Sequence, residues 1–442
     1  MPRRTLWLIL ATVVVSVACY ERADRNPYGR WLSEALAIID RYYVEPVDEQ
    51  QLFEGALDGM VSRLDTYSAY LPSSQAPQFK EAIDQQYGGI GIEVSLEGDD
   101  KQLTVMSPLV GTPAYKAGVR AGDQIVAIDG RKTAKRNLNE IVGWLRGREG
   151  EPVTISVERE GHDEPIDFKL VRARIKIDSV LGDLRQRDGS WNFMLPGEEK
   201  IGYLRINSFG ESTVEEMHRA LAWLTKRDCQ GVILDMRNNP GGLLDAAEQV
   251  CDMFLPRGAV IVTTRGRDER IRNEARASGR GEYQDLPLVV LVNDRSASAA
   301  EIVAACLQDH GRAAVVGNRT WGKGTVQNMI SLEGGRSLLK LTIANYWRPS
   351  GKNIHRFESS TEQDEWGVRP DPGLEVKLDD KQISELVEQR RLRDVVPPAD
   401  LSPGEPEAEL PTGSPTEFDP QLLRAVEVLR EEIAAVDGPA AA

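Results

Sequence analysis

The sequence predicts an α/β domain, because short apolar runs alternate with amphipathic segments through the second half of the chain. The runs are residues 200–209, 231–237, 286–293 and 313–317. Near-continuous apolar runs of this length are typical of strands buried on both faces of a sheet. Apolar residues recur at helical spacing in the segments between the runs, namely 211–226, about 243–255 and 299–307. Strands and helices in alternation are the pattern of an α/β fold.

The length and charge of the chain limit the classes of protein to which it can belong. Its 442 residues predict two or three domains, and an apolar content of 41% is enough for real hydrophobic cores. The formal net charge of −15 argues against nucleic acid as a partner and against a basic membrane-binding patch. The sequence contains no His-Glu-x-x-His, and its four cysteines fit neither a metal site nor a disulfide framework. We therefore expect no metal and no organic cofactor.

The first 19 residues have the pattern of an export signal. Met-Pro-Arg-Arg supplies a positive region, and residues 6–18 form an apolar run that is too short for a comfortable membrane span. The sequence therefore predicts an exported protein, periplasmic or otherwise extracytoplasmic. Cleavage, lipidation at Cys19 and retention as a membrane anchor all remain open. Residues 28–86 follow as a helical region, because apolar residues recur there at helical spacing.

Ser298 lies where the apolar run 286–293 gives way to a helix. Backbone N–H groups are unpaired in the first turn of a helix, and the helix dipole is positive there. The N–H of Ala299 could therefore stabilise an oxyanion that forms beside the serine hydroxyl. Ser298-x-x-Glu301 also fits a capping box, so a purely structural role for this serine is the alternative.

Lys323 follows 25 positions later, between two glycines that permit close approach of the backbone. Lysine is a poor base at its reference pKa of about 10.4, but burial favours the neutral amine. Gln327 lies four residues further on, where its amide oxygen could orient the lysine amine. A solvated loop lysine is the alternative interpretation. A third segment is the turn Asn-Asn-Pro-Gly-Gly that ends with Gly241 and Gly242, whose irregular backbone could supply a second oxyanion donor.

Together these segments resemble the carboxyl-terminal processing peptidases, the S41-type serine endopeptidases that use a Ser–Lys dyad. The matching stretches are Leu-Asp-Met-Arg-Asn-Asn-Pro-Gly-Gly, Ser-Ala-Ser-Ala-Ala-Glu-Ile, Gly-Lys-Gly-Thr-Val-Gln and residues 339–351. The resemblance implies a crotonase/ClpP-like catalytic fold with Ser298 as nucleophile, Lys323 as general base and Gln327 as its orienting residue. It also implies that the N–H of Ala299 and one N–H from Gly241 or Gly242 form the oxyanion hole.

Residues 87–172 resemble a PDZ domain inserted between the helical region and the catalytic domain. The glycine-rich stretch Gly89-Ile90-Gly91-Ile92 runs into a strand, and further strands and two helices follow. A PDZ domain binds a peptide C-terminus as an added edge strand, with loop N–H groups on the carboxylate. The implied partners are proteins or peptides with accessible C-terminal tails. In some relatives an arginine in the stretch of Arg146 couples the PDZ domain to the protease site, whereas a solvated helix-end arginine is the alternative here.

The remaining boundaries follow from composition. We expect a serine protease domain over 173–375, a linker or tail over 376–415, and a helix within 416–442 that docks on its own chain or on a partner. Self-association and an adaptor or activator protein also remain open. Two other functions compete with the peptidase: a hydrolase with a histidine base, His310 or His355, and a catalytically latent PDZ adaptor that only binds tails.

Overall fold

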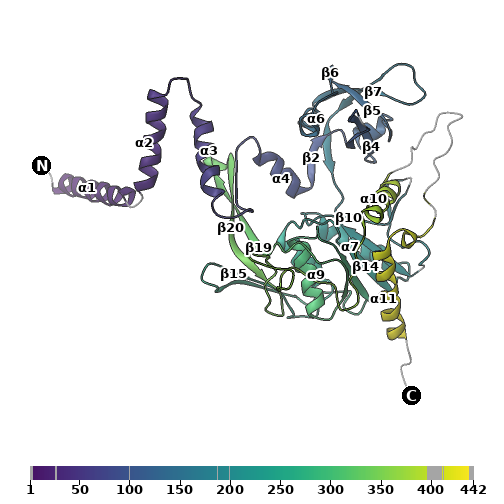
Figure 1. Cartoon of the computed structure of the whole chain (residues 1–442). Coiled ribbons are helices and arrows are strands. Elements are labelled where there is room, and N and C mark those ends of the chain that lie inside the picture. Colours follow the sequence, from purple (N-terminus) through teal and green to yellow (C-terminus); the bar gives the residue numbers. More distant parts are fainter. Residues whose placement is uncertain are drawn as a thin grey trace. The chain divides into compact units, whose positions relative to one another are not determined.

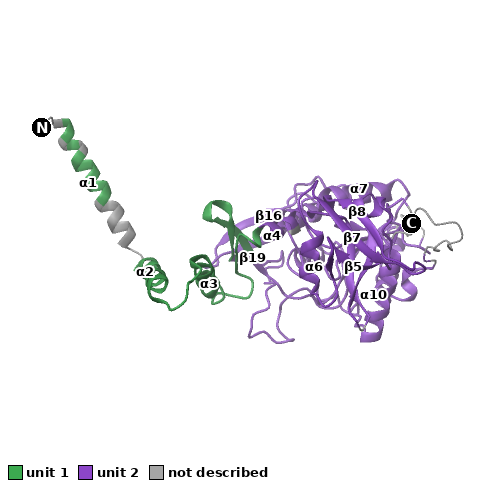
Figure 2. Ribbon diagram, turned by 90° about the horizontal axis from the view of Figure 1, so that it is seen from above, with its two compact units in different colours: residues 1–76, 327–342 green, residues 77–326, 343–442 purple. Residues whose placement is uncertain are grey.

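The computed structural model describes residues 3–24, 27–98, 100–186, 188–198, 200–395, 411 and 413–437. The chain forms two units, which are coloured separately in Figure 2. Unit 1 comprises residues 1–76 and 327–342, and unit 2 comprises residues 77–326 and 343–442.

Unit 1 contains the N-terminal helices α1 (Arg3–Asp24), α2 (Pro27–Tyr42) and α3 (Glu49–Val61), of which α2 and α3 lie in the region predicted to be helical. Asp48 caps α3 by accepting hydrogen bonds from two backbone N–H groups of the first turn. Strand β1 (Ala69–Leu71) pairs with residues 338–340 of β20 (Ser337–Trp347), and β19 (Thr325–Leu332) also pairs with β20. No helix among the described residues is long and apolar enough to cross a membrane. The backbone of Cys19 lies in α1, but its side chain is outside what the structure describes.

Unit 2 contains a five-stranded sheet in the order β10-β13-β14-β17-β18. Its strands are β10 (Val180–Leu181), β13 (Ile201–Ile206), β14 (Gly231–Asp235), β17 (Leu288–Val292) and β18 (Ala314–Gly317). Figure 1 labels β10 and β14 of this sheet and the helices α7, α9 and α11. The four longer strands are parallel, and each pairs with the next one in the sequence. These are the four apolar runs of the sequence, and the predicted α/β class is confirmed.

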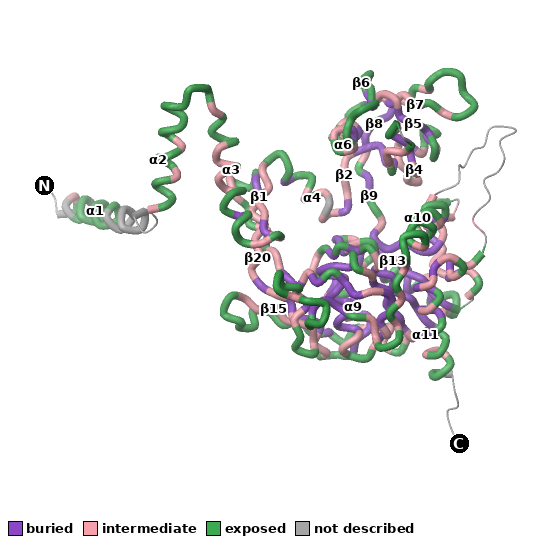
Figure 3. Tube along the Cα trace, in the orientation of Figure 1, coloured by how far each residue is buried: buried purple, intermediate pink, exposed green. Residues whose placement is uncertain are grey.

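Alternate residues of these strands supply two separate hydrophobic cores. On one face, Leu204, Leu234 and Val290 pack against α7 (Thr213–Thr225), α8 (Leu244–Asp252) and α9 (Ala299–Asp309). On the other face, Tyr203, Ile233 and Val289 pack against Leu422, Val426 and Leu429 of α11 (Pro420–Asp437). A strand exposes successive side chains to opposite faces, so continuous apolar runs are needed where both faces are covered. Figure 3 shows the resulting buried centre.

The PDZ-like part of unit 2 has its own sheet in the order β3-β4-β5-β7-β8, with β6 (Arg131–Lys132) paired to β5. Its strands are β3 (Ile92–Glu97), β4 (Gln102–Pro108), β5 (Gln124–Ile128), β7 (Pro152–Glu158) and β8 (Ile166–Val171). Helices α5 (Pro113–Lys116) and α6 (Leu138–Leu145) contribute to its separate core. The pair β2 (Gln86–Gly89) and β9 (Ala173–Lys176) brings its two ends together. Strand β3 is an edge strand of this sheet, and an edge strand is where a PDZ domain adds a peptide strand.

The peripheral elements of unit 2 include two hairpins and several short pieces. Strand β15 (Val260–Arg265) pairs with β16 (Ile271–Arg276) on one side and with residues 345–347 of β20 on the other. Strands β11 (Leu184–Arg185) and β12 (Trp191–Asn192) form a second hairpin. Helix α4 (Ala76–Asp84) precedes β2, and two 3₁₀ turns cover 333–335 and 415–417.

The structure differs from the sequence prediction in the segment expected to be a linker. Residues 380–394 form helix α10 (Asp380–Asp394), which begins with a capping box between Asp379 and Gln382. Ion pairs stabilise its C-terminal end, since Arg390 and Arg393 both pair with the buried Asp183. The linker prediction is therefore wrong for this stretch, because long-range ion pairs stabilise a helix of low apolar content. Residues 396–410 lie outside the described residues.

Candidate active site

Ser298 occupies a strained backbone position at the first turn of α9. Its φ of 56° and ψ of −117° differ from the extended conformation that helix-capping residues adopt. Positive φ is costly for a residue with a side chain, and such strain is concentrated at functional sites. Ser298 is also buried, with 6% of its surface exposed. The strain fits the nucleophile interpretation, and the capping-box bond from the N–H of Ser298 to Glu301 is also present, so the two interpretations are compatible.

The carboxylate of Glu301 joins the start of α9 to the loop that carries Lys323. Its Oε2 accepts hydrogen bonds from the N–H of Ser298 and from the N–H of Lys323, both at 2.8 Å. The two backbone nitrogens can therefore be no farther apart than the sum of these distances, 5.6 Å. Oε1 accepts from the N–H of Gly322 at 2.7 Å and from the hydroxyl of Thr320 at 2.5 Å.

The environment of Glu301 shifts its titration. Its side chain is fully buried, and this burial raises the pKa of the carboxyl to about 7, although its four hydrogen bonds act in the opposite direction. The capping-box pattern of the sequence predicts only one of these contacts, the bond from the N–H of Ser298 to Glu301. The other three donors come from residues 320–323, which a local pattern cannot reveal.

The turn after β14 is held rigidly by the buried side chain of Asn239. The Asn239 amide donates to the carbonyl of Ile206 at 2.6 Å, and its Oδ1 accepts from the N–H of Gly241 at 2.8 Å. The Asn239 carbonyl in turn accepts from the N–H of Ala297 at 2.9 Å, next to Ser298. Side-chain and backbone bonds thus fix the turn against the start of α9.

The two predicted glycines differ in what they can contribute. Gly241 has a φ of +98°, and a Cβ on it would lie 2.7 Å from Cβ of Ser298, so only glycine fits here. Its N–H is already donated to Asn239. Gly242 is exposed and forms a parallel bridge with Phe209, in which the carbonyl of Gly241 and the N–H of Leu243 make the bonds. Among the described residues, the N–H groups of Gly242 and Ala299 donate to no protein acceptor.

Gln327 belongs to unit 1, whereas Ser298 and Lys323 belong to unit 2. The Gln327 amide donates to the hydroxyl of Thr342 at 3.2 Å, and that hydroxyl donates to Asp65 at 3.2 Å. Thr342 and Asp65 fix the amide of Gln327 within its own unit, and no local sequence pattern predicts these contacts.

The two histidines considered as alternative bases lie in different places. His310 follows the last residue of α9, about 18 Å along the helix axis from Ser298. Its Nε2 also lies 2.7 Å from the carbonyl of Val260. His310 is therefore too distant to take a proton from Ser298. The backbone of His355 packs against Gly324, where an added Cβ would lie 2.2 Å from its nitrogen.

Comparison with known proteins gives the family. Residues 200–371 match the model of peptidase family S41, residues 104–159 match a PDZ domain, and residues 22–74 match the N-terminal domain of the activating protease CtpB. A carboxy-terminal-processing protease of Bartonella bacilliformis is 37% identical over 386 residues, which are 85% of this chain and 82% of the relative. The chain belongs to the carboxy-terminal processing peptidases of family S41.

Two further proteins are similar to this chain. The carboxy-terminal processing protease CtpB of Bacillus subtilis is 33% identical over 78% of this chain and 69% of its own length. The solved structure of a photosystem II D1 C-terminal processing protease is 29% identical and covers 82% of this chain and 96% of its own, with a TM-score of 0.45. As an S41 peptidase with a PDZ domain, this protein acts on protein substrates.

The PDZ loop predicted to bind a carboxylate has a glycine at a position that other residues could not take. Gly91 has a φ of +78°, and a Cβ there would collide with Thr112. The carbonyls of Ile90 and Gly91 accept from Ala114 and Leu109, which ties the loop to its own domain.

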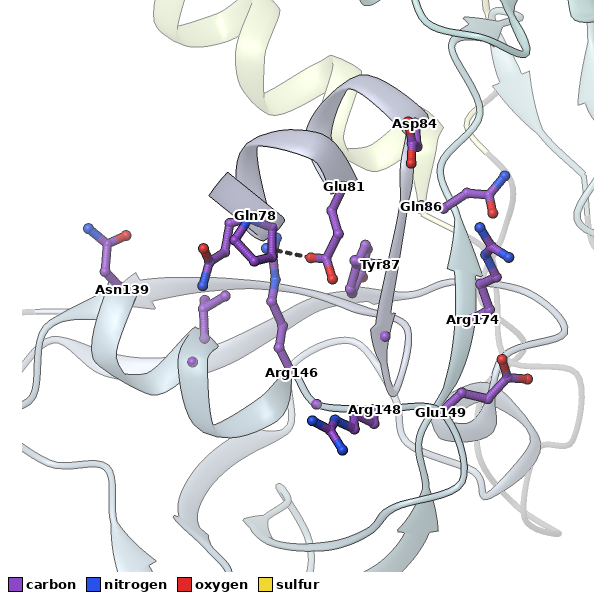
Figure 4. A pocket seen from close by; sticks show the side chains of 15 residues that line it. Gln78, Glu81, Asp84, Gln86, Tyr87, Asn139, Arg146, Arg148, Glu149 and Arg174 are labelled. Atoms are coloured by element: carbon purple, nitrogen blue, oxygen red, sulfur yellow. Dashed lines mark ion pairs between the residues drawn. The ribbon is translucent and has the colours of Figure 1, made fainter. Parts of the chain in front are cut away.

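Arg146 lies at the end of α6, beside a cavity of about 800 Å³ (Figure 4). The cavity is lined by α4, β2, α6 and residues 146–149, so it is separate from the Ser298 site. Arg146 lies 3.6 Å from Glu81 of α4 and stacks over the ring of Tyr87. These contacts connect α4 to the PDZ-like part. The coupling of Arg146 to the protease site stays a prediction.

Proposed function

We propose that this S41 peptidase is an exported serine endopeptidase that cleaves proteins near their C-termini, with Ser298 as nucleophile and Lys323 as general base. The single observation that carries the proposal is the Glu301 carboxylate, which binds the backbone N–H of both residues through one oxygen atom. This shared acceptor holds the backbones of Ser298 and Lys323 close together in space, although the two residues are 25 positions apart in the sequence.

In the first step, the neutral amine of Lys323 takes the hydroxyl proton of Ser298, and the serine oxygen attacks the carbonyl carbon of the scissile peptide bond. The resulting ammonium then protonates the leaving amine as the bond breaks. Water hydrolyses the acyl-enzyme ester in the second half of the reaction, with Lys323 again accepting a proton. The role of Gln327 in orienting the lysine stays a prediction from the family resemblance.

The oxyanion would be stabilised by the N–H groups of Ala299 and Gly242. Both groups lack a protein acceptor among the described residues, and Ala299 is the first residue of α9, where the helix dipole favours negative charge. Gly241 is the weaker candidate because its N–H is bonded to Asn239.

Tail capture is assigned to the PDZ domain. A substrate C-terminus would add to the free edge of β3, with its carboxylate at the N–H groups of Gly89 to Ile92. Apolar side chains near this edge, Val94 and Leu96, are half-buried and could contact an apolar tail.

The test is cleavage of an unfolded reporter protein with an apolar C-terminal tail. Wild-type protein should cleave it, whereas Ser298→Ala, Lys323→Ala and Lys323→Arg should lose at least 10³-fold in kcat, since arginine stays protonated and cannot act as a base. Matched controls are Ser350→Ala and Lys352→Ala, which change the same residue types at exposed or half-exposed positions.

The alternatives give different results. Activity that survives Lys323→Ala but is lost in His355→Ala would replace the lysine base with a histidine. A wild-type protein that binds the tail without cutting it would be a latent adaptor. Amidation of the reporter's C-terminal carboxylate should raise KM if the PDZ loop binds that group.

Export is proposed from the N-terminal pattern of two arginines followed by an apolar run. Fractionation of cells that express the full chain should place it outside the cytoplasm, and Cys19→Ser should leave this unchanged if Cys19 is not lipidated. Recovery in the cytoplasmic fraction would refute the proposal.

A further inference from the structure

The C-terminal helix α11 lies outside the segment that matches the S41 model, yet it contacts β14, the strand that leads into the turn Asn238–Gly242. The family match ends at residue 371, and α11 begins at Pro420. Leu422, Val426 and Leu429 attach the helix to one face of the central sheet. The helix is thus an integral layer of unit 2.

A buried group of charges connects the start of α11 to the end of β14. Arg237 is the last residue before the turn Asn238–Gly242, and its side chain is 6% exposed. Its Nη1 and Nη2 donate to the two carboxylate oxygens of Asp419 at 2.9 and 2.7 Å. The same guanidinium donates to Asp235 of β14, with a shortest distance of 2.6 Å.

Each carboxylate in this group also accepts hydrogen bonds from donors other than the guanidinium. Asp419 also accepts the N–H of Leu422 at 3.0 Å, which caps α11. Asp235 also accepts from the hydroxyl of Tyr203 at 2.6 Å and from the backbone N–H of Arg237 at 3.0 Å. Burial alone would lower the pKa of the guanidinium, but the charges of Asp235 and Asp419 hold the pKa of Arg237 well above its ordinary value. The arginine therefore stays charged and bound to both.

The turn that follows has little freedom to move. Gly241 would place a Cβ within 2.7 to 2.9 Å of Ser298, Ala297 and Ala299, so the two backbones are already in close contact. Arg237 directly precedes this turn in the chain, so a displacement of Arg237 would shift the turn. Misplacement by about 1 Å in a catalytic site can cost on the order of 10²-fold in rate.

We propose that Asp419 is a positioning residue of the active site. Through Arg237 it holds the turn Asn238–Gly242, the oxyanion turn, and it thereby makes α11 a necessary part of the catalytic machinery. This inference rests on the proposed function only for its kinetic consequence. The structural consequence, a turn held from α11, can be measured without any activity.

The test variant is Asp419→Asn in the full chain. Asparagine is a good helix cap, so the bond to Leu422 can remain, but its amide nitrogen would face the Nη2 donor of Arg237. The matched control is Glu427→Gln on the same helix, where the exposed carboxylate pairs with Arg424. We expect Asp419→Asn to lower kcat about tenfold or more with KM within twofold, whereas the control keeps both.

Amide hydrogen exchange supplies the second readout. Exchange over residues 236–245 should rise in Asp419→Asn and stay at the wild-type rate in Glu427→Gln, while α6 in the PDZ-like part changes in neither. Unchanged exchange over 236–245 in a folded Asp419→Asn overturns the proposal. If that variant does not fold, Gln421→Ala decides, because it removes the neutral acceptor that lies 3.0 Å from Nη1 of Arg237 and leaves Asp419 in place; it also removes the bond that the Gln421 amide donates to the carbonyl of Val376 at 2.8 Å.

Turnover of the two variants distinguishes a failure of this proposal from a failure of the proposed function. Normal turnover in Asp419→Asn, together with no turnover in Ser298→Ala, overturns the positioning role and leaves the peptidase intact. Equal turnover in wild type and Ser298→Ala overturns the nucleophile assignment, while the exchange measurement still decides the role of Asp419.

Discussion

Replacing Gly241 by alanine tests the geometry of the turn most directly. The new Cβ would lie 2.7 Å from Cβ of Ser298, 2.8 Å from the carbonyl oxygen of Ala297 and 2.9 Å from the nitrogen of Ala299. Carbon atoms in good contact are about 3.5–4.0 Å apart. The turn and the start of α9 must therefore separate by about 1 Å.

Two costs add in Gly241→Ala. Holding alanine at a positive φ costs about 1–2 kcal/mol, and forcing a methyl group into a packed site costs about 1–3 kcal/mol. We expect the free energy of unfolding to fall by about 2–5 kcal/mol. A 1 Å displacement of Ser298 from its oxyanion donors should also lower kcat on the order of 10²-fold.

Gly258→Ala is the matched control. Gly258 has a φ of +85°, and a Cβ there would meet nothing within 4 Å. It therefore isolates the conformational cost, and we expect a loss of about 1–2 kcal/mol with normal kcat. Urea denaturation gives the stability, and reporter cleavage well below the melting temperature gives kcat. A Gly241→Ala protein that cleaves within threefold of wild type, or a Gly258→Ala protein that is equally impaired, would refute the reasoning.

Three further predictions concern the buried polar groups. Glu301→Gln should cost about 1–3 kcal/mol of stability and lower kcat, because one amide orientation or the other leaves a backbone N–H facing a donor; unchanged denaturation and turnover would contradict this. The raised pKa of Glu301, about 7, means that the folded state binds more protons than the unfolded state between pH 4.5 and 7, so stability should fall over that interval by up to about 3 kcal/mol. Urea denaturation at pH 5 and pH 7.5 measures this change, and the difference between wild type and Glu301→Gln gives the part due to Glu301, because other carboxyl groups with shifted pKa values are present in both proteins. Asn239→Ala removes the donor to Ile206 and the acceptor for Gly241, and we expect it to lower both stability and kcat; normal kcat in this variant would show that the turn does not need its side-chain brace.

Much of the fold could be predicted from the sequence because the signals are local. Each strand of the central sheet is a continuous apolar run, since both of its faces are covered, and the intervening segments have helical periodicity. Ser298 could be placed at a strand-to-helix junction for the same reason. The segment 380–394 could not be predicted as a helix, because its side chains are mostly polar and its stability depends on Asp183, about 200 residues away in the sequence.

The sequence by itself determined the α/β class, the order of the catalytic segments and the residue types available for chemistry. Only the tertiary structure decided how these residues act on one another. Glu301 reaches Lys323 over 22 positions, and Asp419 reaches Arg237 over 182. Periodicity and turn composition report interactions between near neighbours in the chain, whereas a buried carboxylate is matched to whichever donors the fold brings to it. The sequence therefore indicated a serine and a lysine, and the fold alone revealed the carboxylates that bind their backbone and the arginine before the turn Asn238–Gly242.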